Sequence, residues 1–296
     1  EYAADGTNFS VLATSPTSPY SWNVPTVDTT GSKLRLVSTD PVGNQSILET
    51  SSFEIDSTPS PAPSISLNSN LYTNITAVTL TMGNCTDVDS VFINESTAPG
   101  RDDAGWQSCS TNVGAITYTL PAVEGEHTLK AWTKDDVGNV SVSATDVTVY
   151  YDVTNPVLSV TTPPMLRGSS SYTINWTLTE EYIDSSVSFN VDYWNGSTWL
   201  NIVDQAVTAG PHSSQSFSHN WTTPALDRDD LLIRVEVTDL AGNTGTIQTS
   251  AFEIDSTAPA STLDDPPALL QGGDIQNLTF SSTDANGVDT LLLQYA

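Results

Sequence analysis

The chain has 296 residues, of which 35 are acidic and 8 are basic, so its formal net charge is −27. So few cations, spread along the chain, exclude a nucleic-acid surface and a polybasic membrane contact. No stretch approaches the roughly 20 apolar residues of a transmembrane helix, so we expect no direct membrane insertion. Hydrophobic residues make up 38% of the chain, which is enough for packed cores, and at roughly 100–200 residues per domain the length predicts two or three domains.

Short alternating runs of apolar and polar residues favour strands along the whole chain, and no stretch has a convincing helical periodicity. Three such runs each precede a copy of the motif Asp-x-x-Gly-Asn. The runs are residues 34–37, 129–132 and 233–237. The motif copies are residues 40–44, 135–139 and 239–243. A second extended run follows each copy, and two strands around a Gly-Asn turn predict a β-hairpin.

A second shared element, Asp-x-Thr with a proline soon after, follows each hairpin. Its aspartates are Asp56, Asp152 and Asp255. They follow the first residue of the turn motif by 16, 17 and 16 residues, and the repeat period is 96 and then 103 residues. Proline removes a backbone donor and stiffens the chain, so this element predicts an interdomain linker.

One aromatic residue stands three residues before a proline at the same register of each repeat. The aromatic residues are Trp22, Tyr118 and Trp221, and the prolines are Pro25, Pro121 and Pro224. One aromatic per repeat at one register indicates a core residue of a strand. A sugar-stacking platform is the alternative interpretation.

Strands with turn signals about every 8–12 residues, repeating at about 100 residues, predict an all-β chain of tandem immunoglobulin-like (Ig-like) β-sandwiches, arranged like beads on a string. The predicted domains are 1–57, the C-terminal part of one domain; 58–154 and 155–257, two complete domains; and 258–296, the N-terminal part of another. Residues 1–3 and 294–296 both resemble residues 192–194 of the complete domain. The chain is therefore either a fragment of a longer array or a subunit whose half-domains are completed by the next subunit.

The cysteine count is even, because the chain holds only Cys85 and Cys109. A pair in an acidic, strand-rich chain favours a disulfide in an exported protein. A free thiol or a metal-binding pair is the alternative, and no further cysteine or nearby histidine supports it.

The Asp-x-x-Gly-Asn turns and the Phe-Glu-Ile-Asp-Ser-Thr linkers resemble the bacterial Ig-like repeats of large secreted adhesins and surface proteins, over the whole chain. The resemblance implies long extracellular stalks whose acidic loops at domain junctions often bind calcium. It says little about the ligand. The middle domain departs from its neighbours, because it carries the cysteine pair and an insert-like segment at 94–106.

The acidic residues predict where such calcium would bind. About 12 extended residues, spanning roughly 40 Å, separate the turn from the linker of the same domain. The turn should therefore face the linker of the preceding domain, together with the connection between the second and third strands. That connection is acidic in every copy. Crowded carboxylates repel one another unless a cation intervenes, and Ca²⁺ takes 6–8 oxygen ligands from such loops.

We therefore expect a structural calcium site at each of three junctions. The first would use Asp56, Asp87, Asp89, Asp135 and Asp136. The second would use Asp152, Glu180, Glu181, Asp184 and Asp239. The third would use Asp255, Asp284 and Asp289, and Asp40 is the orphan counterpart near the N-terminus. The alternative is that these aspartates only form turns and caps.

Enzymatic chemistry has little support in the sequence, because His127, His212 and His219 show no metal spacing and no nucleophile motif. We interpret them as solvated surface residues. Trp194 and Trp199 lie on the two arms of a predicted hairpin, where they would pack across the strands. The alternative is that these two residues contact a glycan.

The sequence thus favours a non-enzymatic extracellular segment of a secreted bacterial surface protein, with a structural or adhesive role and calcium-stiffened joints. Its expected partners are neighbouring Ig-like domains, of the same array or of the next subunit, and glycans or proteins on a host or prey surface. Two alternatives stay open. One is a carbohydrate-binding accessory module of a secreted enzyme, and the other is a filament subunit that polymerises by complementation of its terminal half-domains.

Overall fold

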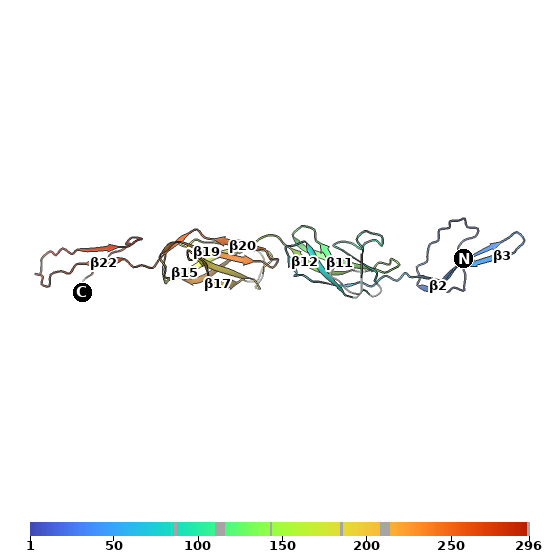
Figure 1. The fold of residues 1–296 in the computed structure, drawn as a ribbon, viewed down its shortest axis with the longest axis horizontal. Helices are drawn as coiled ribbons and strands as arrows, with labels where there is room; N and C mark the ends of the chain where they lie inside the picture. Colours follow the sequence, from blue (N-terminus) through green and yellow to red (C-terminus); the bar gives the residue numbers. More distant parts are fainter. Residues whose placement is uncertain are drawn as a thin grey trace. The chain divides into compact units, whose positions relative to one another are not determined.

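The computed structural model describes residues 1–83, 85, 88–109, 116–142, 144–183, 186–207 and 214–294. Every regular element among these residues is a β-strand (Figure 1), which confirms the predicted all-β fold class of tandem Ig-like β-sandwiches. No helix that could span a membrane is present among them. The chain divides into two compact units, 1–71 with 75–151 and 72–74 with 152–296. The domain boundaries expected at 57, 154 and 257 stay predictions.

The first unit begins with a sheet in the order β1-β2-β3, with β4 also paired to β2. Its strands are β1 (Tyr2–Ala3), β2 (Thr29–Thr39), β3 (Gln45–Glu49) and β4 (Phe53–Ile55). The β2–β3 hairpin closes around the first Gly-Asn turn, with Thr39 opposite Gln45 (Figure 1). Residues 1–57 thus contribute a single sheet.

Two sheets complete the first unit, in the orders β10-β7-β5 and β12-β11-β8-β9. The strands are β5 (Ser64–Leu67), β7 (Ala77–Gly83), β8 (Ser90–Asn94), β9 (Gln107–Ser108), β10 (Ile116–Thr119), β11 (Gly125–Lys134) and β12 (Thr145–Tyr151). Val78, Leu80 and Met82 alternate along β7 and are buried against residues such as Val91 and Leu129 from the other sheet. This alternation is that of a sandwich with one solvated face per sheet.

The second unit contains a larger sandwich, with sheets in the orders β13-β15-β18 and β14-β21-β19-β16-β17, and with β20 paired to β19. Its strands are β13 (Val157–Val160), β14 (Leu166–Arg167), β15 (Ser171–Thr179), β16 (Ser188–Trp194), β17 (Trp199–Ala206), β18 (Gln215–Thr222), β19 (Arg228–Thr238), β20 (Thr244–Gln248) and β21 (Phe252–Asp255). The short β6 (Tyr72–Thr73) also belongs to this unit. Trp176, Phe189 and Phe217 meet at the centre of its core, with ring centroids 4.7–6.0 Å apart.

The second unit ends in an antiparallel hairpin of β22 (Ala260–Leu263) and β23 (Phe280–Thr283) (Figure 1). It lies outside the sandwich just described, since the sheet of β22 and β23 has two strands only.

The three hairpins predicted around the Gly-Asn turns are confirmed. Thr238 lies opposite Thr244, and in the middle repeat Lys134 and Val140 form an isolated bridge. The prediction of one long strand after each turn is wrong. In the outer copies it breaks into β3 and β4 or into β20 and β21, and in the middle copy β12 begins only at Thr145, after the bridge at Val140. The break has a physical reason in the last copy: the Thr249 hydroxyl accepts a hydrogen bond from the Ile233 amide and so takes a place in the ladder.

The predicted core role of the repeated aromatic residue is confirmed for Trp221 and Tyr118, whereas Trp22 lies outside the strands and the two core clusters. Trp221 is buried, and Tyr118 packs partly buried against the first core. Trp22 is half-buried, and its ring lies 5.1 Å from that of Tyr2. The predicted disulfide also forms, between Cys85 and Cys109.

The interpretation of His127 as a solvated residue is wrong. The side chain is buried, and its two ring nitrogens lie 2.9 Å from Glu95 Oε2 and 2.8 Å from the Val123 carbonyl oxygen. His219 is half-buried on β18, and His212 lies outside the described residues.

Candidate metal centre

The third Gly-Asn turn is held by the side chain of its own first residue. Asp239 Oδ1 accepts hydrogen bonds from the amides of Gly242, at 2.7 Å, and Asn243, at 2.8 Å. Asp239 Oδ2 accepts a third from the Asn243 side-chain amide, at 2.9 Å. An aspartate whose carboxylate accepts hydrogen bonds from the backbone of its own turn forms an Asx-type turn. Asp239 therefore does form the turn, as the alternative interpretation expects.

The same Asn243 amide reaches the linker. Its Nδ2 donates to the Asp152 carbonyl oxygen at 3.0 Å, so turn and linker are hydrogen-bonded through backbone and side chain. Asp152 Oδ1 accepts from the Thr154 amide at 2.9 Å. The expectation that the turn meets the linker preceding it thus agrees with the geometry, and it brings the Asp239 carboxylate close to that of Asp152.

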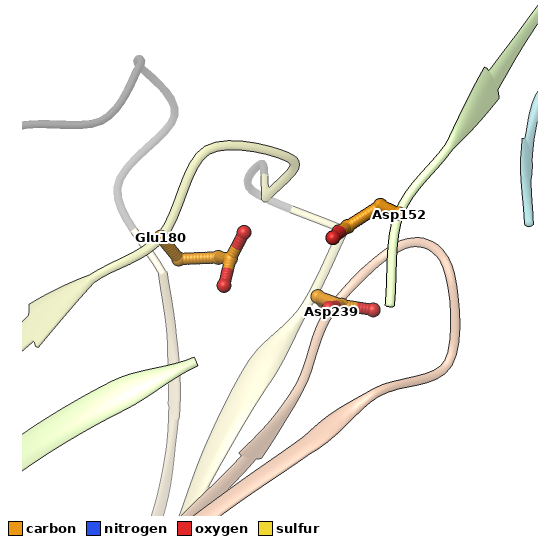
Figure 2. A group of neighbouring side chains, drawn as sticks. All are labelled: Asp152, Glu180 and Asp239. Atoms are coloured by element: carbon orange, nitrogen blue, oxygen red, sulfur yellow. The ribbon is translucent and has the colours of Figure 1, made fainter. Parts of the chain in front are cut away.

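Glu180 completes a three-carboxylate group, which we call the acidic cluster: Asp152, Glu180 and Asp239. One carboxylate oxygen from each lies within 4.8 Å of the other two, and all three residues are buried. They come from three segments, the linker, the end of β15 and the β19–β20 turn (Figure 2). Glu180 follows the last residue of β15, where its Oε1 accepts from the Glu181 and Tyr182 amides at 2.6 and 3.0 Å.

Burial affects the pKa of Glu180 more strongly than these hydrogen bonds do. Desolvation raises its pKa above the ordinary 4.5, the two backbone amides act in the opposite direction, and the charge of Asp239 raises it further. Three acidic groups in a buried space are therefore an electrostatic strain on the folded chain near neutral pH. A divalent cation with carboxylate oxygen ligands would relieve it, and such oxygens suit hard cations such as Ca²⁺, Mg²⁺ and Mn²⁺.

The first linker carries a more open version of this arrangement. Asp56, Asp89, Asp135 and Asp136 line one groove of about 610 Å³, together with Cys85 and Val88. The Asp135 carboxylate accepts from three turn amides, of Val137, Gly138 and Asn139. Within the described residues, only the acidic cluster brings three potential metal-ligating groups within 4.8 Å of one another.

The remaining predicted ligands that the structure describes do not belong to a group of three such carboxylates. Glu181 is exposed, and Asp87 and Asp184 lie outside the described residues. Asp255 Oδ2 accepts from the Asn286 side chain at 3.1 Å, and Asp284 Oδ1 accepts from the Asn286 amide. Asp289 is exposed. Asp40 is also exposed, and its carboxylate binds Val42 and Asn44 of its own turn.

Sequence reasoning missed the asparagine that ends each turn motif. Asn139 Nδ2 donates to the Asp56 carbonyl oxygen at 3.2 Å, as Asn243 does to Asp152 at 3.0 Å. The sequence pattern alone indicates only a turn-forming role for the Asn in Asp-x-x-Gly-Asn. Its repetition beside a repeated linker was the signal that it has a second partner.

It also missed the aspartate that fixes the other side of the linker. Asp28 accepts from the Ser57 amide at 2.7 Å and the Thr58 hydroxyl at 2.8 Å. Asp227 binds the last linker in the same way, through the amide of Ser256 and the hydroxyl of Thr257. These hydrogen bonds, the linker serine amide first, lower the pKa of both aspartates. The signal was an Asp three residues after the repeated proline, at positions 28 and 227.

Trp194 and Trp199 lie opposite each other at the β16–β17 turn, with ring centroids 5.6 Å apart. The Arg234 guanidinium lies 4.4 Å from the centre of the Trp199 ring. The geometry is that of a cross-strand aromatic pair with a cation–π contact. It agrees with the structural interpretation of this hairpin.

No protein-family model matches the chain, and no curated protein matches it. One similar solved structure is the tetra-tandem repeat in the extending region of a large adhesion protein, with 18% identity and a TM-score of 0.34 over 80% of this chain and 60% of that one. Another is the chicken CNTN1 FN1–FN3 domains, with 14% identity and a TM-score of 0.29 over 74% and 77%. A third is Escherichia coli alpha-2-macroglobulin activated by porcine elastase, with 10% identity and a TM-score of 0.26 over 78% of this chain and 25% of that one. At these values the likenesses carry no argument about function.

Proposed function

We propose that this chain is a non-enzymatic structural segment of an extracellular adhesive stalk, and that calcium bound at the acidic cluster fixes the linker to the sandwich that follows it. The observation that carries the calcium proposal is the burial of Asp152, Glu180 and Asp239 with ligand atoms within 4.8 Å of one another. The extracellular setting is supported by the Cys85–Cys109 disulfide, because such bonds persist in oxidising compartments.

The proposed role follows from where the three ligands lie in the chain. Asp152 belongs to the linker, whereas Glu180 and Asp239 belong to the sandwich after it. An ion shared by all three would join the two parts at one point and reduce the freedom of the linker. Without the ion, the Asn243 hydrogen bond to the Asp152 carbonyl oxygen is a neutral contact, worth roughly 1 kcal/mol.

The other linker contacts support the same mechanical role. Asp227 binds Ser256 and Thr257, and Asp28 binds Ser57 and Thr58, so each of these linkers is also held by the sheet that precedes it. A linker that is hydrogen-bonded on both sides transmits force and orientation better than a free one. The proline at or near its end restricts it further.

Thermal unfolding with and without calcium tests the proposal. We expect calcium to raise the melting temperature of the second sandwich and EGTA to lower it, because only the folded state presents the three carboxylates together. Magnesium at the same concentration is the ionic-strength control, since it needs a stricter octahedral geometry. Melting curves that are the same in calcium and EGTA would reject the calcium site.

The variant Glu180→Gln separates the effect of the metal from that of the fold. Its effect on the melting temperature should have opposite signs in EGTA and in calcium. In EGTA the variant should melt at or above the wild-type temperature near neutral pH, because it removes a desolvated charge. In calcium it should melt below the wild type, because a ligand has been lost. Glu181→Gln, at an exposed neighbouring position, is the matched control and should leave both curves unchanged. A calcium response that survives in Glu180→Gln would overturn the assignment of this ligand.

A further inference from the structure

A short segment from much earlier in the chain belongs to the unit that holds the acidic cluster. Residues 72–74 stand between β5 and β7 in the sequence, yet they belong to the same compact unit as residues 152–296. Closing a chain over so long a separation costs entropy, so specific contacts have to hold the segment in place. These contacts go to the groups that support the three carboxylates.

Asn74 supports the turn that carries Asp239. Its Nδ2 donates a hydrogen bond to Asn243 Oδ1 at 3.2 Å, across 169 residues of sequence. The Asn243 Nδ2 donates to Asp239 Oδ2 at 2.9 Å and to the Asp152 carbonyl oxygen at 3.0 Å. Because the oxygen of the Asn243 amide is bonded to Asn74, its nitrogen is the atom that faces the turn and the linker. Asn74 therefore sets the orientation in which Asn243 joins the two.

Thr73 holds the linker through the backbone. Its carbonyl oxygen accepts a hydrogen bond from the Asp152 amide at 3.0 Å, and its side chain is buried. The backbone of Asp152 is therefore bonded on both sides, with its amide to Thr73 and its carbonyl oxygen to Asn243. Two such bonds at one residue restrict the direction in which its carboxylate points.

Tyr72 packs against the support of Glu180. Its ring centroid lies 5.8 Å from that of Tyr182, a usual separation for a packed aromatic pair. The Tyr182 amide donates to Glu180 Oε1 at 3.0 Å, and the Tyr182 carbonyl oxygen accepts from the Leu240 amide, next to Asp239, at 3.1 Å. Tyr182 thus joins the loop after β15 to the β19–β20 turn, and the ring of Tyr72 packs on this connection.

Three consecutive residues therefore reach the supports of all three carboxylates. The contact of Tyr72 serves Glu180, that of Thr73 serves Asp152, and that of Asn74 serves Asp239. Groups that lie one step behind metal ligands orient those ligands and set the metal affinity of a site. One segment that reaches every support can arrange the acidic cluster as a whole.

The last linker meets a corresponding segment that lacks these side chains. The two-residue strand β14 lies between β13 and β15, as β6 lies between β5 and β7, so residues 166–168 correspond to residues 72–74. The Gly168 amide donates to the Asp255 carbonyl oxygen at 2.8 Å, but a Cβ at Gly168 would collide with the Ser256 side chain. No side-chain amide can therefore stand there. Among the residues that the structure describes, Asp255 belongs to no group of three potential metal ligands.

From these contacts, we propose that residues 72–74 form a clasp that positions the linker and the three carboxylates, and that closure of the clasp and calcium binding favour each other. The calcium part of this inference rests on the function proposed above, whereas the positioning of the linker does not. Such coupling is reciprocal, because a ligand stabilises the conformation that binds it better. The clasp is part of the connection from β5 to β7, so calcium would order this connection as well as the linker.

Calcium titration of Asn74→Ala gives the first test. We expect calcium to bind roughly tenfold more weakly than in the wild type, as is usual when a group behind the metal ligands is removed. Asn70→Ala, at an exposed position of the same connection, is the matched control and should bind calcium as the wild type does. If the wild type binds calcium and Asn74→Ala binds it equally tightly, the inference is wrong and the calcium site stands.

Two further measurements separate positioning from general stabilisation. A side chain that only stabilises the fold lowers the melting temperature equally in calcium and in EGTA, whereas Asn74→Ala should also reduce the rise that calcium causes. In the double variant with Asn243→Ala, Asn74→Ala should weaken calcium binding no further, because Asn74 acts through Asn243. An unchanged rise, or losses of affinity that add up in the double variant, would overturn this positioning role.

Hydrogen exchange in EGTA tests the clasp without any metal. The Asp152 amide donates to the Thr73 carbonyl oxygen, so its exchange should be several-fold faster in Asn74→Ala than in the wild type and unchanged in Asn70→Ala. If the wild type binds no calcium, the function proposed above fails, and faster exchange in Asn74→Ala still supports the clasp. Equal exchange of the Asp152 amide in all three chains would overturn the clasp, whether or not calcium binds.

Discussion

The linkers at Asp56 and Asp152 each meet a Gly-Asn turn of the same kind, yet among the described residues only the second linker belongs to a closed group of acids. In both, the turn aspartate binds its own backbone and the turn asparagine donates to the linker carbonyl oxygen. At the first linker the carboxylates line an open groove, and at the second they lie within 4.8 Å of one another and are buried. The difference is Glu180, which reaches in from the end of β15.

Linker attachment and the gathering of acids are therefore two separate properties, although both involve the Asp-x-x-Gly-Asn motif. The Asp-x-x-Gly-Asn turn attaches the linker by hydrogen bonds, and at the second linker Glu180, the residue after β15, completes the buried acidic cluster. In the first repeat the corresponding residue is Asn84, a neutral one, which lies outside the described residues. At the second linker the turn motif supplies one of the three carboxylates, and the linker and the end of β15 supply the other two.

Removing the disulfide should have the largest effect on stability, and this effect should fall on the sandwich beside the first linker. Cys85 lines the groove beside the first linker, and the bond closes a sequence separation of 24 residues. The Cys85→Ser and Cys109→Ser double variant should lose roughly 3 kcal/mol of unfolding free energy in the chain-entropy model. Thermal unfolding should show this loss in the first sandwich only. A shift of the second sandwich's transition instead would contradict the assignment.

Asp239→Ala should break the second linker site. In saturating calcium we expect a loss of about 2 kcal/mol, because buried hydrogen bonds to a charged group are removed together with a metal ligand. Asp40→Ala is the matched control in an exposed copy of the same turn. It should change the melting temperature less and leave the calcium response intact. Equal changes in melting temperature and calcium response in the two variants would show that burial of Asp239 at the second linker adds nothing to its contribution.

Asn243→Ala should weaken the linker attachment without removing a carboxylate. The side chain is buried and bonds Asp239 and the Asp152 carbonyl oxygen, so we expect a loss of about 1 kcal/mol. Hydrogen exchange at the amides of residues 153–155 should become faster in the variant. Asn44→Ala, in the exposed turn, is the control for the turn itself. Unchanged exchange in Asn243→Ala would contradict its role at the linker.

The smallest effect should come from His127, which lies in the first sandwich. Burial lowers its pKa, but hydrogen bonds to Glu95 and the Val123 carbonyl and the Glu95 charge outweigh it, so the pKa is raised above 6.5. A raised folded-state pKa stabilises the fold fully below pH 6.5, and this stabilisation is lost as the pH rises through the folded value. The melting temperature of the first sandwich should therefore fall over this window. In His127→Gln the fall should disappear, and a wild-type curve that rises there would contradict the sign.

The strands, the hairpins and the disulfide could be predicted from the sequence because they depend on local patterns: alternation, a Gly-Asn turn and a cysteine pair. The position of the turn beside the preceding linker also followed from strand length. His127 was misjudged, since its partner Glu95 is 32 residues away and no local pattern joins them. The long final strand was misjudged because a single hydroxyl, that of Thr249, replaces a ladder position.

The acidic cluster could be predicted only in part, for a related reason. The sequence points to Asp152, Glu180 and Asp239, but it points equally to the exposed Glu181, because sequence spacing does not show which of two adjacent acids is buried. Asp28 and Asp227 were missed because their partners, the linker serines and threonines, each lie about 30 residues away in the chain.

Isothermal titration with calcium at neutral pH tests the central claim most directly. The wild-type chain should show one site that is tighter than any other, with a Kd of roughly 10⁻⁴ M, as is usual for extracellular calcium modules. Glu180→Gln should abolish that site, whereas Asp89→Asn, in the open groove of the first linker, should leave it unchanged. Calcium binding that is lost in Asp89→Asn and kept in Glu180→Gln, or no calcium binding at all, would contradict the account.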